Sequence, residues 1–336
     1  MIEVVKKDEK KLISQLIEYL NLGEITNIKR FKSNQNKVYK VEIGIKTYVV
    51  KQYSKDAIRN IYDLNKRKLQ ISVSEKLLEN NINTIVPLKY KNRYFIKFKG
   101  DYYLLFYYYN YETLKPKDIS EKEITKLAQT LANIHKLNLR VNLPCQYKKI
   151  KIDLDQYLQE YKNIDKKLYN TLKENYNNLK NLIDECNNSL KYVKQNLCIS
   201  HNDYKVLNML WNNDEMYLLD FDAVAMSNPY VSLAEAAFVY SKQNKVINKE
   251  IYKMFLMRYF EIIETHDIDY KLILNVAMNG KLQWLSYIMG QCSTGNISKV
   301  NDVIKMIENL IVYYINKNDL YNIYVELKKN ISKNTE

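Results

Sequence analysis

Residues 199–222 read I-S-H-N-D-Y-K-V-L-N-M-L-W-N-N-D-E-M-Y-L-L-D-F-D, and this stretch decides the fold. It places His201, Asp203 and Asn208 in one short segment. Two apolar runs separated by the polar residues N-N-D-E follow, a pattern typical of a β-hairpin. Because the second strand of a hairpin returns beside the first, Asp220 at its end is predicted to come back to the start of the hairpin.

This set of side chains suits the transfer of a phosphoryl group to a hydroxyl. Such a reaction needs little covalent help from the protein and depends mainly on positioning and charge neutralisation. One carboxylate must face the acceptor hydroxyl, and Asp203 can do this from a loop. A second carboxylate and an amide oxygen, from Asp220 and Asn208, can hold Mg²⁺, which prefers oxygen ligands. A lone His-x-Asp has many explanations, but this joint spacing has few.

The motifs S-H-N-D-Y-K-V-L-N-M-L-W, Y-L-L-D-F-D-A and S-N-P-Y-V-S-L-A-E resemble those of the aminoglycoside phosphotransferase and choline kinase families. These families are small-molecule relatives of the protein kinases. The resemblance is strongest over Leu197–Glu235 and continues in order across most of the chain. It implies that Asp203 is the catalytic base, that Asn208 and Asp220 bind Mg²⁺, and that His201 is a buried residue that braces the loop.

The resemblance also implies an α+β, protein-kinase-like two-lobe fold. A small antiparallel-sheet lobe is expected over residues 1–106 and a larger, mainly helical lobe over residues 107–336. The nucleotide, ATP or GTP, is expected in the cleft between the lobes. With 336 residues and 46% hydrophobic content, the chain is long enough to form two such cores.

Strands are predicted over Ile25–Phe31 and Lys37–Ile43, the second with period-two alternation over residues 38–43, after a leading helix over Lys10–Leu22. The loop between the two strands occupies the place of a phosphate-covering loop. Protein kinases use glycines there for close backbone approach, and this loop has none. Ser33 and Asn36 are therefore predicted to offer amides and side chains to the phosphates.

The next predicted strand, Thr47–Tyr53, carries Lys51. By resemblance, Lys51 would bind the α- and β-phosphates and pair with a glutamate of the following helix. Glu75 is the expected partner, and Glu79, one turn later, is a competing candidate. A solvated strand lysine is the alternative for Lys51, since lysines are frequent throughout the chain.

Two more strands, Tyr94–Lys99 and Tyr102–Tyr109, joined at Gly100-Asp101, are predicted to complete a five-stranded antiparallel sheet. The resemblance implies that the segment after this sheet binds the adenine edge through backbone groups. Tyr107 and Tyr109 are the residues expected there, and aromatic packing is the alternative role for their rings.

The remainder of the chain is predicted to be mainly helical. Ser120 and Glu123 form a capping box at the start of a buried central helix, whose His135 is expected to be structural. Residues 144–196 are predicted to form two or three inserted helices, which in the family build the acceptor-binding wall. Helices are again expected from Val231 onward.

Lys205 follows Asp203 by two residues, a spacing that matches protein kinases more closely than most aminoglycoside kinases. Its ammonium group is predicted to stabilise charge on the transferring phosphoryl group. A surface lysine without a catalytic role is the alternative.

The net charge of +14, from 52 Lys and Arg against 38 Asp and Glu, raises the possibility of an anionic partner such as nucleic acid. The lysines are spread along the chain without a nucleic-acid-binding motif, so a solvated basic surface is the prediction. The four cysteines form no Cys-x-x-Cys pair, which argues against a zinc site or a disulfide framework. The chain shows no signal-peptide pattern and no membrane-spanning apolar run, so a cytoplasmic location without membrane partners is expected.

The sequence does not identify the acceptor, the preference for ATP or GTP, or the oligomeric state. A cationic, aminoglycoside-like acceptor is predicted because several carboxylates are expected to gather near Asp203. They are Asp153, Asp155, Glu160, Asp222 and Glu235. One alternative is a choline or ethanolamine kinase, since some of the 31 tyrosines could form an aromatic cage for a cation. Another is a non-catalytic spore-coat relative of the kinase fold that serves in binding or scaffolding.

Overall fold

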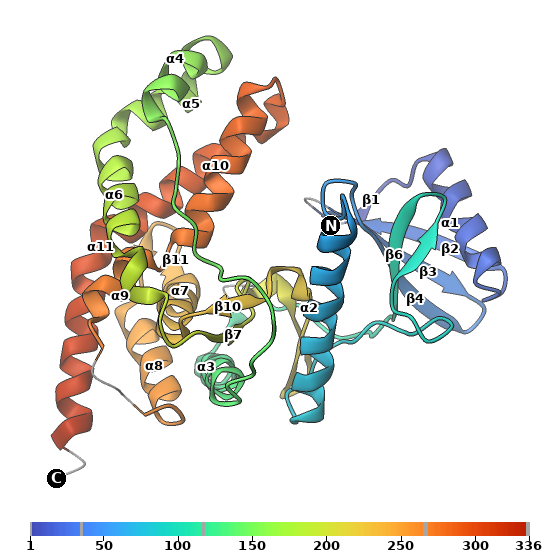
Figure 1. Cartoon of the computed structure of the whole chain (residues 1–336), viewed down its shortest axis with the longest axis horizontal. Coiled ribbons are helices and arrows are strands. Elements are labelled where there is room, and N and C mark those ends of the chain that lie inside the picture. Colours follow the sequence, from blue (N-terminus) through green and yellow to red (C-terminus); the bar gives the residue numbers. More distant parts are fainter. Residues whose placement is uncertain (1, 34–35, 116–117, 265–267, 334–336) are drawn as a thin grey trace. The chain divides into compact units, whose positions relative to one another are not determined.

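The computed structural model describes residues 2–33, 36–115, 118–264 and 268–333 (Figure 1). The chain forms two compact units. The sheet unit comprises Met1–Thr113 and Met209–Asp222. The helical unit comprises Leu114–Asn208 and Ala223–Glu336.

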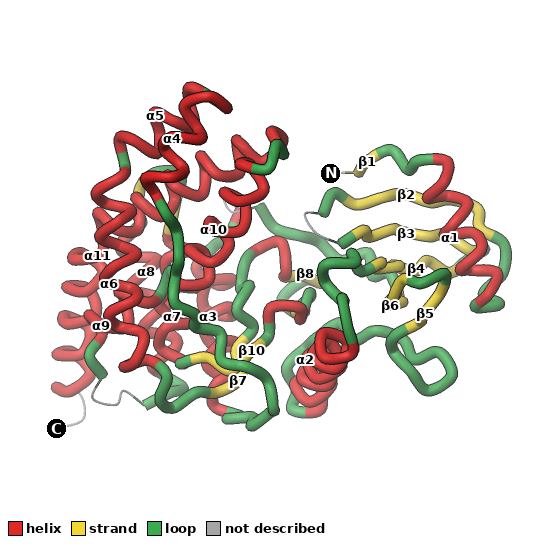
Figure 2. The backbone as a smooth tube through the Cα atoms, turned by 45° about the horizontal axis from the view of Figure 1, so that its top comes forward, coloured by secondary structure: helices red, strands yellow, loops and turns green. Residues whose placement is uncertain are grey.

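The sheet unit contains a six-stranded antiparallel sheet with the strand order β1-β2-β3-β4-β6-β5 (Figure 2). Its strands are β1 (Ile2–Glu3), β2 (Ile25–Phe31), β3 (Lys37–Ile43), β4 (Lys46–Gln52), β5 (Ile96–Phe98) and β6 (Asp101–Tyr107). The prediction of five strands was wrong by one. The two residues of β1 pair with Phe31 and Arg30 of β2, and a strand this short shows no period-two pattern.

One face of the sheet is covered by α1 (Lys7–Tyr19). Ile13, Leu16 and Ile17 of this helix are fully buried and pack in one cluster with sheet residues that include Tyr39. Each such aliphatic side chain contributes about 1.5–3 kcal/mol when it leaves water, so this face anchors the sheet.

The other face of the sheet packs against α2 (Ile61–Glu79) through Leu64 and Ile71. Side chains of a strand alternate between the two faces, so Lys51 of β4 points away from the α1 face that buries Val50. In the sheet register Lys51 lies opposite Leu104 of β6, which belongs to the same cluster as Leu64 and Ile71. The alternation therefore directs the lysine to the α2 side.

The turn between β5 and β6 consists of Lys99 and Gly100, one residue earlier than predicted. Both residues have positive φ, 47° and 86°, as a type I′ hairpin turn requires. Asp101 instead begins β6 and accepts a hydrogen bond from Gln52 Nε2 at 2.8 Å.

The predicted hairpin is present as β8 (Met209–Asn212) and β9 (Glu215–Leu218). Asn213, in the turn, has a φ of 53°, which asparagine tolerates better than most residues. The hairpin joins the sheet unit through a backbone bridge between Thr84 and Leu218.

A second bridge joins Glu112 to Trp211 of the hairpin. The backbone N–H of Glu112 donates to the Trp211 carbonyl at 2.9 Å, and the reverse bond measures 2.8 Å. The sheet unit therefore continues to Thr113 and includes 209–222, whereas the predicted division places its end at residue 106.

The helical unit contains nine α-helices in its described part (Figure 1). They are α3 (Glu121–Lys136), α4 (Leu154–Ile164), α5 (Lys166–Glu174), α6 (Tyr176–Val193), α7 (Pro229–Ser241), α8 (Lys249–Phe260), α9 (Tyr270–Val276), α10 (Asn279–Ser293) and α11 (Val300–Lys333). The capping box at the start of α3 is confirmed: the Ser120 backbone N–H donates to the Glu123 carboxylate at 2.8 Å, and Ser120 Oγ accepts from the Lys122 N–H at 3.2 Å. The predicted insertion corresponds to α4, α5 and α6.

Two short strand pairs complete this unit, β7 (Cys198–Ser200) with β10 (Ala225–Ser227) and β11 (Lys242–Gln243) with β12 (Val246–Ile247). Among the described helices, none combines the length and the apolar character needed to cross a membrane. The predicted α+β class is confirmed by the antiparallel sheet of one unit and the helices of the other.

Candidate active site

The loop 201–208 of the helical unit starts directly after β7. Asn202 there adopts a left-handed backbone with a φ of 57°, which asparagine tolerates. Its Nδ2 donates to the Ser200 carbonyl at 3.0 Å, and its Oδ1 accepts from Ser227 Oγ at 2.7 Å. These bonds attach the turn to both β7 and β10 and fix the chain just before Asp203.

Asp203 is held by two neighbours from its own loop. Lys205 Nζ lies 2.7 Å from Asp203 Oδ2. Asn208 Nδ2 donates to the same carboxylate oxygen at 2.7 Å and to the Asp203 carbonyl at 2.9 Å. The Asp203 side chain is still 24% exposed, so the carboxylate is fixed in direction and accessible to a substrate.

A second ion pair influences this carboxylate. Lys281 Nζ of α10 lies 3.2 Å from Glu235 Oε1 of α7. Burial alone would raise the pKa of Asp203, but the charges of Lys205 and Lys281 outweigh it and lower that pKa. Burial raises the pKa of Glu235, and the charge of Lys281 offsets only part of this effect.

A small cavity lies between these groups. Its volume is about 20 Å³, enough for about one water molecule. It is lined by Ser200, Asn202, Lys205, Ser232, Glu235 and Lys281, among others. The helical unit thus has a cavity of about the size of a water molecule next to Lys205, Glu235 and Lys281.

His201 is buried, with 2% of its surface exposed. Its ring meets the ring of Tyr204 edge to face, with the centroids 6.1 Å apart. Tyr204 in turn donates its hydroxyl to the Leu127 carbonyl of α3 at 2.9 Å. This placement agrees with the bracing role that the resemblance implies for His201, and the role itself stays a prediction.

His135 of α3 has partners on both ring nitrogens. Nδ1 lies 2.7 Å from the Tyr259 hydroxyl and Nε2 lies 3.1 Å from Ser200 Oγ. Burial lowers the pKa of His135 to about 3, so the ring is neutral at pH 7. These contacts agree with the structural role predicted for it.

Lys51 lies in the sheet unit between two carboxylates. Its Nζ is 2.9 Å from Asp220 Oδ1 and 2.8 Å from Asp222 Oδ2. Burial alone would lower the pKa of Lys51, but the charges of Asp222 and Asp220 outweigh it, so the pKa is raised and the lysine is charged. The solvated lysine that was the alternative does not describe this side chain, which is only 11% exposed.

Asp220 follows β9 with a left-handed φ of 57°. Its side chain is 44% exposed, about twice the 23% of Asp222. The hairpin thus ends in one accessible carboxylate, and a second, more enclosed one follows two residues later.

The resemblance led us to expect that Glu75 pairs with Lys51. The structure contradicts this expectation. The Glu75 carboxylate bonds to the Tyr94 hydroxyl and lies 3.2 Å from Lys89 Nζ. The helix residues that do reach the site are Arg67 and Gln70, on a part of α2 nearer its start. Each donates to the Asp222 carbonyl, at 2.6 Å and 2.8 Å respectively.

Residues 34 and 35 of the predicted phosphate loop lie outside the described part of the chain. Ser33 Oγ donates to the Asn36 carbonyl. Asn36 Nδ2 donates to Asp222 Oδ2 at 3.0 Å, and its Oδ1 accepts from the Ser54 N–H at 3.2 Å. Asn36 is therefore attached to the surroundings of Lys51, while phosphate binding by this loop stays a prediction.

The rings of Tyr107 and Tyr109 take part in aromatic packing. Tyr107 stacks on Tyr48 at a centroid distance of 5.7 Å, and Tyr109 stacks on Tyr111 at 5.2 Å. Tyr111 continues this row to Tyr217 of the hairpin at 4.9 Å. The packing role that was the alternative accounts for the rings, and adenine binding by the backbone stays a prediction.

The residues predicted to bind a metal ion are Asn208, which belongs to the helical unit, and Asp220, which belongs to the sheet unit. The amide nitrogen of Asn208 is committed to Asp203, so its amide oxygen is the atom that suits a cation. A carboxylate and an amide oxygen are hard ligands of the kind that Mg²⁺ prefers. No group of three or more His, Cys, Asp or Glu side chains able to hold a metal occurs in the described residues.

The carboxylates predicted to attract a cationic acceptor each have a partner of their own. Glu235 pairs with Lys281, and Asp222 pairs with Lys51. The other three serve the insertion itself: Asp153 caps α4, Asp155 accepts from the Tyr176 hydroxyl and Glu160 accepts from Gln156 Nε2. Their local pairing gives no support to a shared acidic wall.

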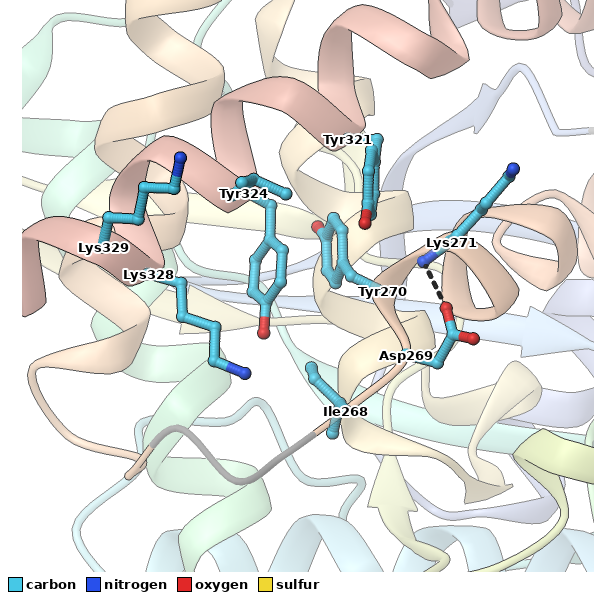
Figure 3. Close-up of a pocket in the computed structure, with 9 residues that line it drawn as sticks. Ile268, Asp269, Tyr270, Lys271, Tyr321, Tyr324, Lys328 and Lys329 are labelled. Carbon is cyan, nitrogen blue, oxygen red and sulfur yellow. Dashed lines mark hydrogen bonds between the residues drawn. The ribbon is translucent and has the colours of Figure 1, made fainter. Parts of the chain in front are cut away.

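A larger cavity of about 670 Å³ lies elsewhere in the helical unit, near the end of α11 (Figure 3). Its lining includes Tyr270, Tyr321, Tyr324, Lys328 and Lys329. Tyr270 and Tyr324 stack at a centroid distance of 4.0 Å. None of the predicted site residues lines this cavity, so its size does not make it the active site.

Comparison with known proteins identifies the family. A model of the phosphotransferase enzyme family matches residues 27–250, which is more than half of the chain. The chain belongs to this phosphotransferase family. The matched region contains Lys51, Asp203, Asn208 and Asp220, so all of the main candidate residues of this phosphotransferase lie inside it.

Solved structures show the same fold at low sequence identity. A spectinomycin phosphotransferase in complex with ADP and spectinomycin has a TM-score of 0.66 at 14% identity, over 90% of this chain and 97% of that one. An amicoumacin kinase in complex with AMP-PNP, Ca²⁺ and Ami has a TM-score of 0.60 at 14% identity, over 90% and 96%. A choline kinase from Streptococcus pneumoniae has a TM-score of 0.57 at 16% identity, over 90% and 99%. These matches confirm the kinase-like two-lobe fold predicted for this phosphotransferase. A search of curated protein sequences found no significant match.

Four residues of the site were missed by sequence reasoning. They are Tyr53, Arg67, Gln70 and Lys281. Arg67 and Gln70 are three residues apart on α2 and so share a face, which is a usable signal once the helix is assigned. Tyr53 follows β4 directly, two residues after Lys51. Lys281 has no local signal, because it lies on α10, far along the chain from Asp203.

Proposed function

We propose that this phosphotransferase moves the γ-phosphoryl group of ATP or GTP to a hydroxyl of a small molecule, with Mg²⁺ as the metal. The observation that carries the proposal is the state of Asp203. Its carboxylate is ionised, fixed by Lys205 and Asn208, and still partly exposed. A carboxylate in this state is suited to orient an acceptor hydroxyl and take its proton.

Lys51 and Lys205 supply the positive charge in this proposal. Lys51 is buried and charged, as a lysine that binds nucleotide phosphates must be. Lys205 is 41% exposed at the edge of the Asp203 carboxylate, where its ammonium group would meet the transferring phosphoryl group. Asn208 and Asp220 would hold Mg²⁺, which neutralises phosphate charge when it is bound.

We further propose a cationic acceptor, on the strength of the family resemblance. Two of the similar structures support this choice by their names, a spectinomycin phosphotransferase and a choline kinase. The five carboxylates that were predicted to attract a cation do not support it, because each of them is paired locally. The acceptor class is therefore the part of the proposal that most needs an experiment.

A panel of acceptors tests the proposal. Aminoglycosides, spectinomycin and choline are compared with neutral sugars and nucleosides, each with Mg²⁺-ATP and Mg²⁺-GTP, and phosphorylated product is detected by mass spectrometry. Product from cationic compounds alone is expected. Product confined to neutral hydroxyl compounds would exclude the cationic acceptor and leave the kinase assignment in place. Absence of nucleotide binding in the same protein would favour a non-catalytic binding role.

A further inference from the structure

Lys51, the lysine of the candidate nucleotide site, has ion-pair partners that differ from the expected Glu75. Both carboxylates that contact Lys51 come from the segment after β9, and neither comes from α2. We propose that Asp222 is the residue that positions Lys51 for the nucleotide, and that α2 acts on this pair by holding the backbone of Asp222. The inference rests on the proposed function and assigns to Asp222 a positioning role that the sequence analysis did not predict.

The carboxylate of Asp222 is fixed by four side chains from three separate segments. Its Oδ2 lies 2.8 Å from Lys51 Nζ and 3.0 Å from Asn36 Nδ2. Its Oδ1 accepts from the Tyr53 hydroxyl at 2.8 Å and lies 3.8 Å from Arg67 Nη1. Because both oxygens have partners on different elements, the carboxylate has little freedom to rotate, and it can hold the ammonium group of Lys51 in one place.

Arg67 and Gln70 attach α2 to the main chain of Asp222. Arg67 Nη1 and Gln70 Nε2 donate to its carbonyl oxygen at 2.6 Å and 2.8 Å. Arg67 Nη1 also donates to Gln70 Oε1 at 3.0 Å, so the two side chains support each other. Arg67 is 13% exposed and Gln70 is 1% exposed, which makes these bonds part of the interior of the sheet unit. A shift of α2 would therefore move Asp222, and with it the ammonium group of Lys51.

The two carboxylates beside Lys51 are suited to different tasks. Asp220 is 44% exposed and is the residue assigned to the metal ion. Asp222 is 23% exposed and is enclosed by Tyr53, Arg67 and Asn36. If Asp220 binds Mg²⁺, Asp222 would remain as the fixed partner of Lys51. The division leaves Glu75, which is occupied by Tyr94 and Lys89, outside this network.

The first experiment measures the pair without any nucleotide. Lys51→Met, Asp222→Asn and the double variant are compared with wild type by thermal unfolding. Because removing one partner leaves the other charge buried, each single change is expected to lower Tm, and the double change is expected to lower Tm by less than the sum of the two. The pair Arg59→Ala and Asp63→Asn on α2, where Arg59 is 68% exposed, is the control and is expected to show a weaker coupling, because exposed ion pairs contribute little. Additive losses for Lys51 and Asp222 would overturn the proposed pairing.

The second experiment measures nucleotide affinity by calorimetry, with Mg²⁺ and with EDTA. Asp222→Asn is expected to weaken binding roughly 10- to 100-fold in both conditions, since it removes a charged partner of Lys51. Tyr53→Phe keeps all charges and is expected to weaken binding roughly 2- to 10-fold, which covers the case in which Asp222→Asn fails to fold. Asp63→Asn is the control and is expected to bind as wild type does.

The comparison with Glu75→Gln decides between two anchors. A larger loss of affinity in Glu75→Gln than in Asp222→Asn would make the α2 glutamate the partner of Lys51 and overturn the proposal. A loss in Asp222→Asn that appears only with Mg²⁺ would make Asp222 a metal ligand and would also overturn it. Wild-type protein that binds no nucleotide would refute the proposed function, while the coupling of Lys51 and Asp222 in the unfolding experiment would be unaffected.

Discussion

At the scale of single residues, Asp203 carries contacts that set different properties of its carboxylate. Asn208 fixes its direction through two hydrogen bonds, and Lys205 supplies charge at 2.7 Å. Lys281 adds charge from α10, where it is itself paired with Glu235. Direction and ionisation therefore depend on different neighbours, so substitutions can test them separately.

Asp203→Asn is expected to keep nucleotide affinity and to reduce turnover by roughly 10²–10⁴-fold, the range of a positioned acid or base. Asparagine has a similar shape but cannot accept the proton of the acceptor hydroxyl. Calorimetry gives the affinity, and basal nucleotide hydrolysis gives the turnover before the acceptor is known. Asp63→Asn is the matched control. Turnover at the wild-type rate in the Asp203 variant would exclude this residue as the base.

Lys281→Met is expected to move the acid limb of the pH–rate profile to higher pH. The base acts in its ionised form, so activity is lost as the pH falls through the pKa of Asp203. Lys281 lowers that pKa, and its removal raises it. The measurement is kcat/KM against pH, with Lys245→Met as the control because Lys245 pairs with Glu308 at the surface. An unchanged acid limb would show that Lys281 does not act on the base.

The sequence could predict that Asp203 and Asn208 lie together because their spacing is local and chemically restrictive, and the two side chains are in contact. It could not identify Lys281 or Arg67, because tertiary packing brings them to their partners. It named Glu75, with Glu79 as the alternative, and did not consider Arg67 or Gln70, since a pattern of apolar positions does not show how far along α2 the contact lies. Side chains that act from another element need the fold before they can be assigned.

At the scale of elements, the period of the apolar residues decided how well each strand was predicted. β2 and β3 have the predicted bounds, and polar and apolar residues alternate along β3. β4 begins and ends one residue before the predicted range. β1 was missed because backbone pairing with β2, and not a pattern of its own, makes it a strand. Short edge strands of this kind are a general limit of sequence reasoning.

The hairpin β8–β9 delivers Asp220, so this element should control the metal dependence of nucleotide binding. Asp220→Ala is expected to make nucleotide affinity the same with Mg²⁺ as with EDTA, because the variant lacks the carboxylate assigned to the ion. Calorimetry in both conditions checks this. Asp214→Ala, in the turn of the same hairpin, is the control and should keep the metal dependence. A variant at position 220 that still gains affinity from Mg²⁺ would assign the ion to other ligands.

At the scale of the whole molecule, the candidate residues are shared by the two units. Lys51, Asp220 and Asp222 belong to the sheet unit, and Asp203 and Asn208 belong to the helical unit. The predicted boundary at residue 106 differs from this division because the hairpin 209–222 returns to the sheet unit. Hydrophobic patterns show that two cores exist, but the return of a later segment depends on backbone bridges that no pattern reveals.

A ligand that binds the folded protein and not the unfolded chain stabilises the fold by an amount that grows with the logarithm of its concentration relative to its Kd. Mg²⁺-nucleotide at about 100 times its Kd is therefore expected to add about 2.7 kcal/mol to the free energy of unfolding. For a chain of this size the result is a rise of several degrees in Tm, measured by differential scanning fluorimetry. Mg²⁺ alone is the control for a general ionic effect, and Lys51→Met should lose most of the rise because it lacks the charge assigned to the phosphates. An unchanged Tm at millimolar Mg²⁺-ATP and Mg²⁺-GTP would mean that the fold has kept the charged residues of a phosphotransferase without using them to bind nucleotide.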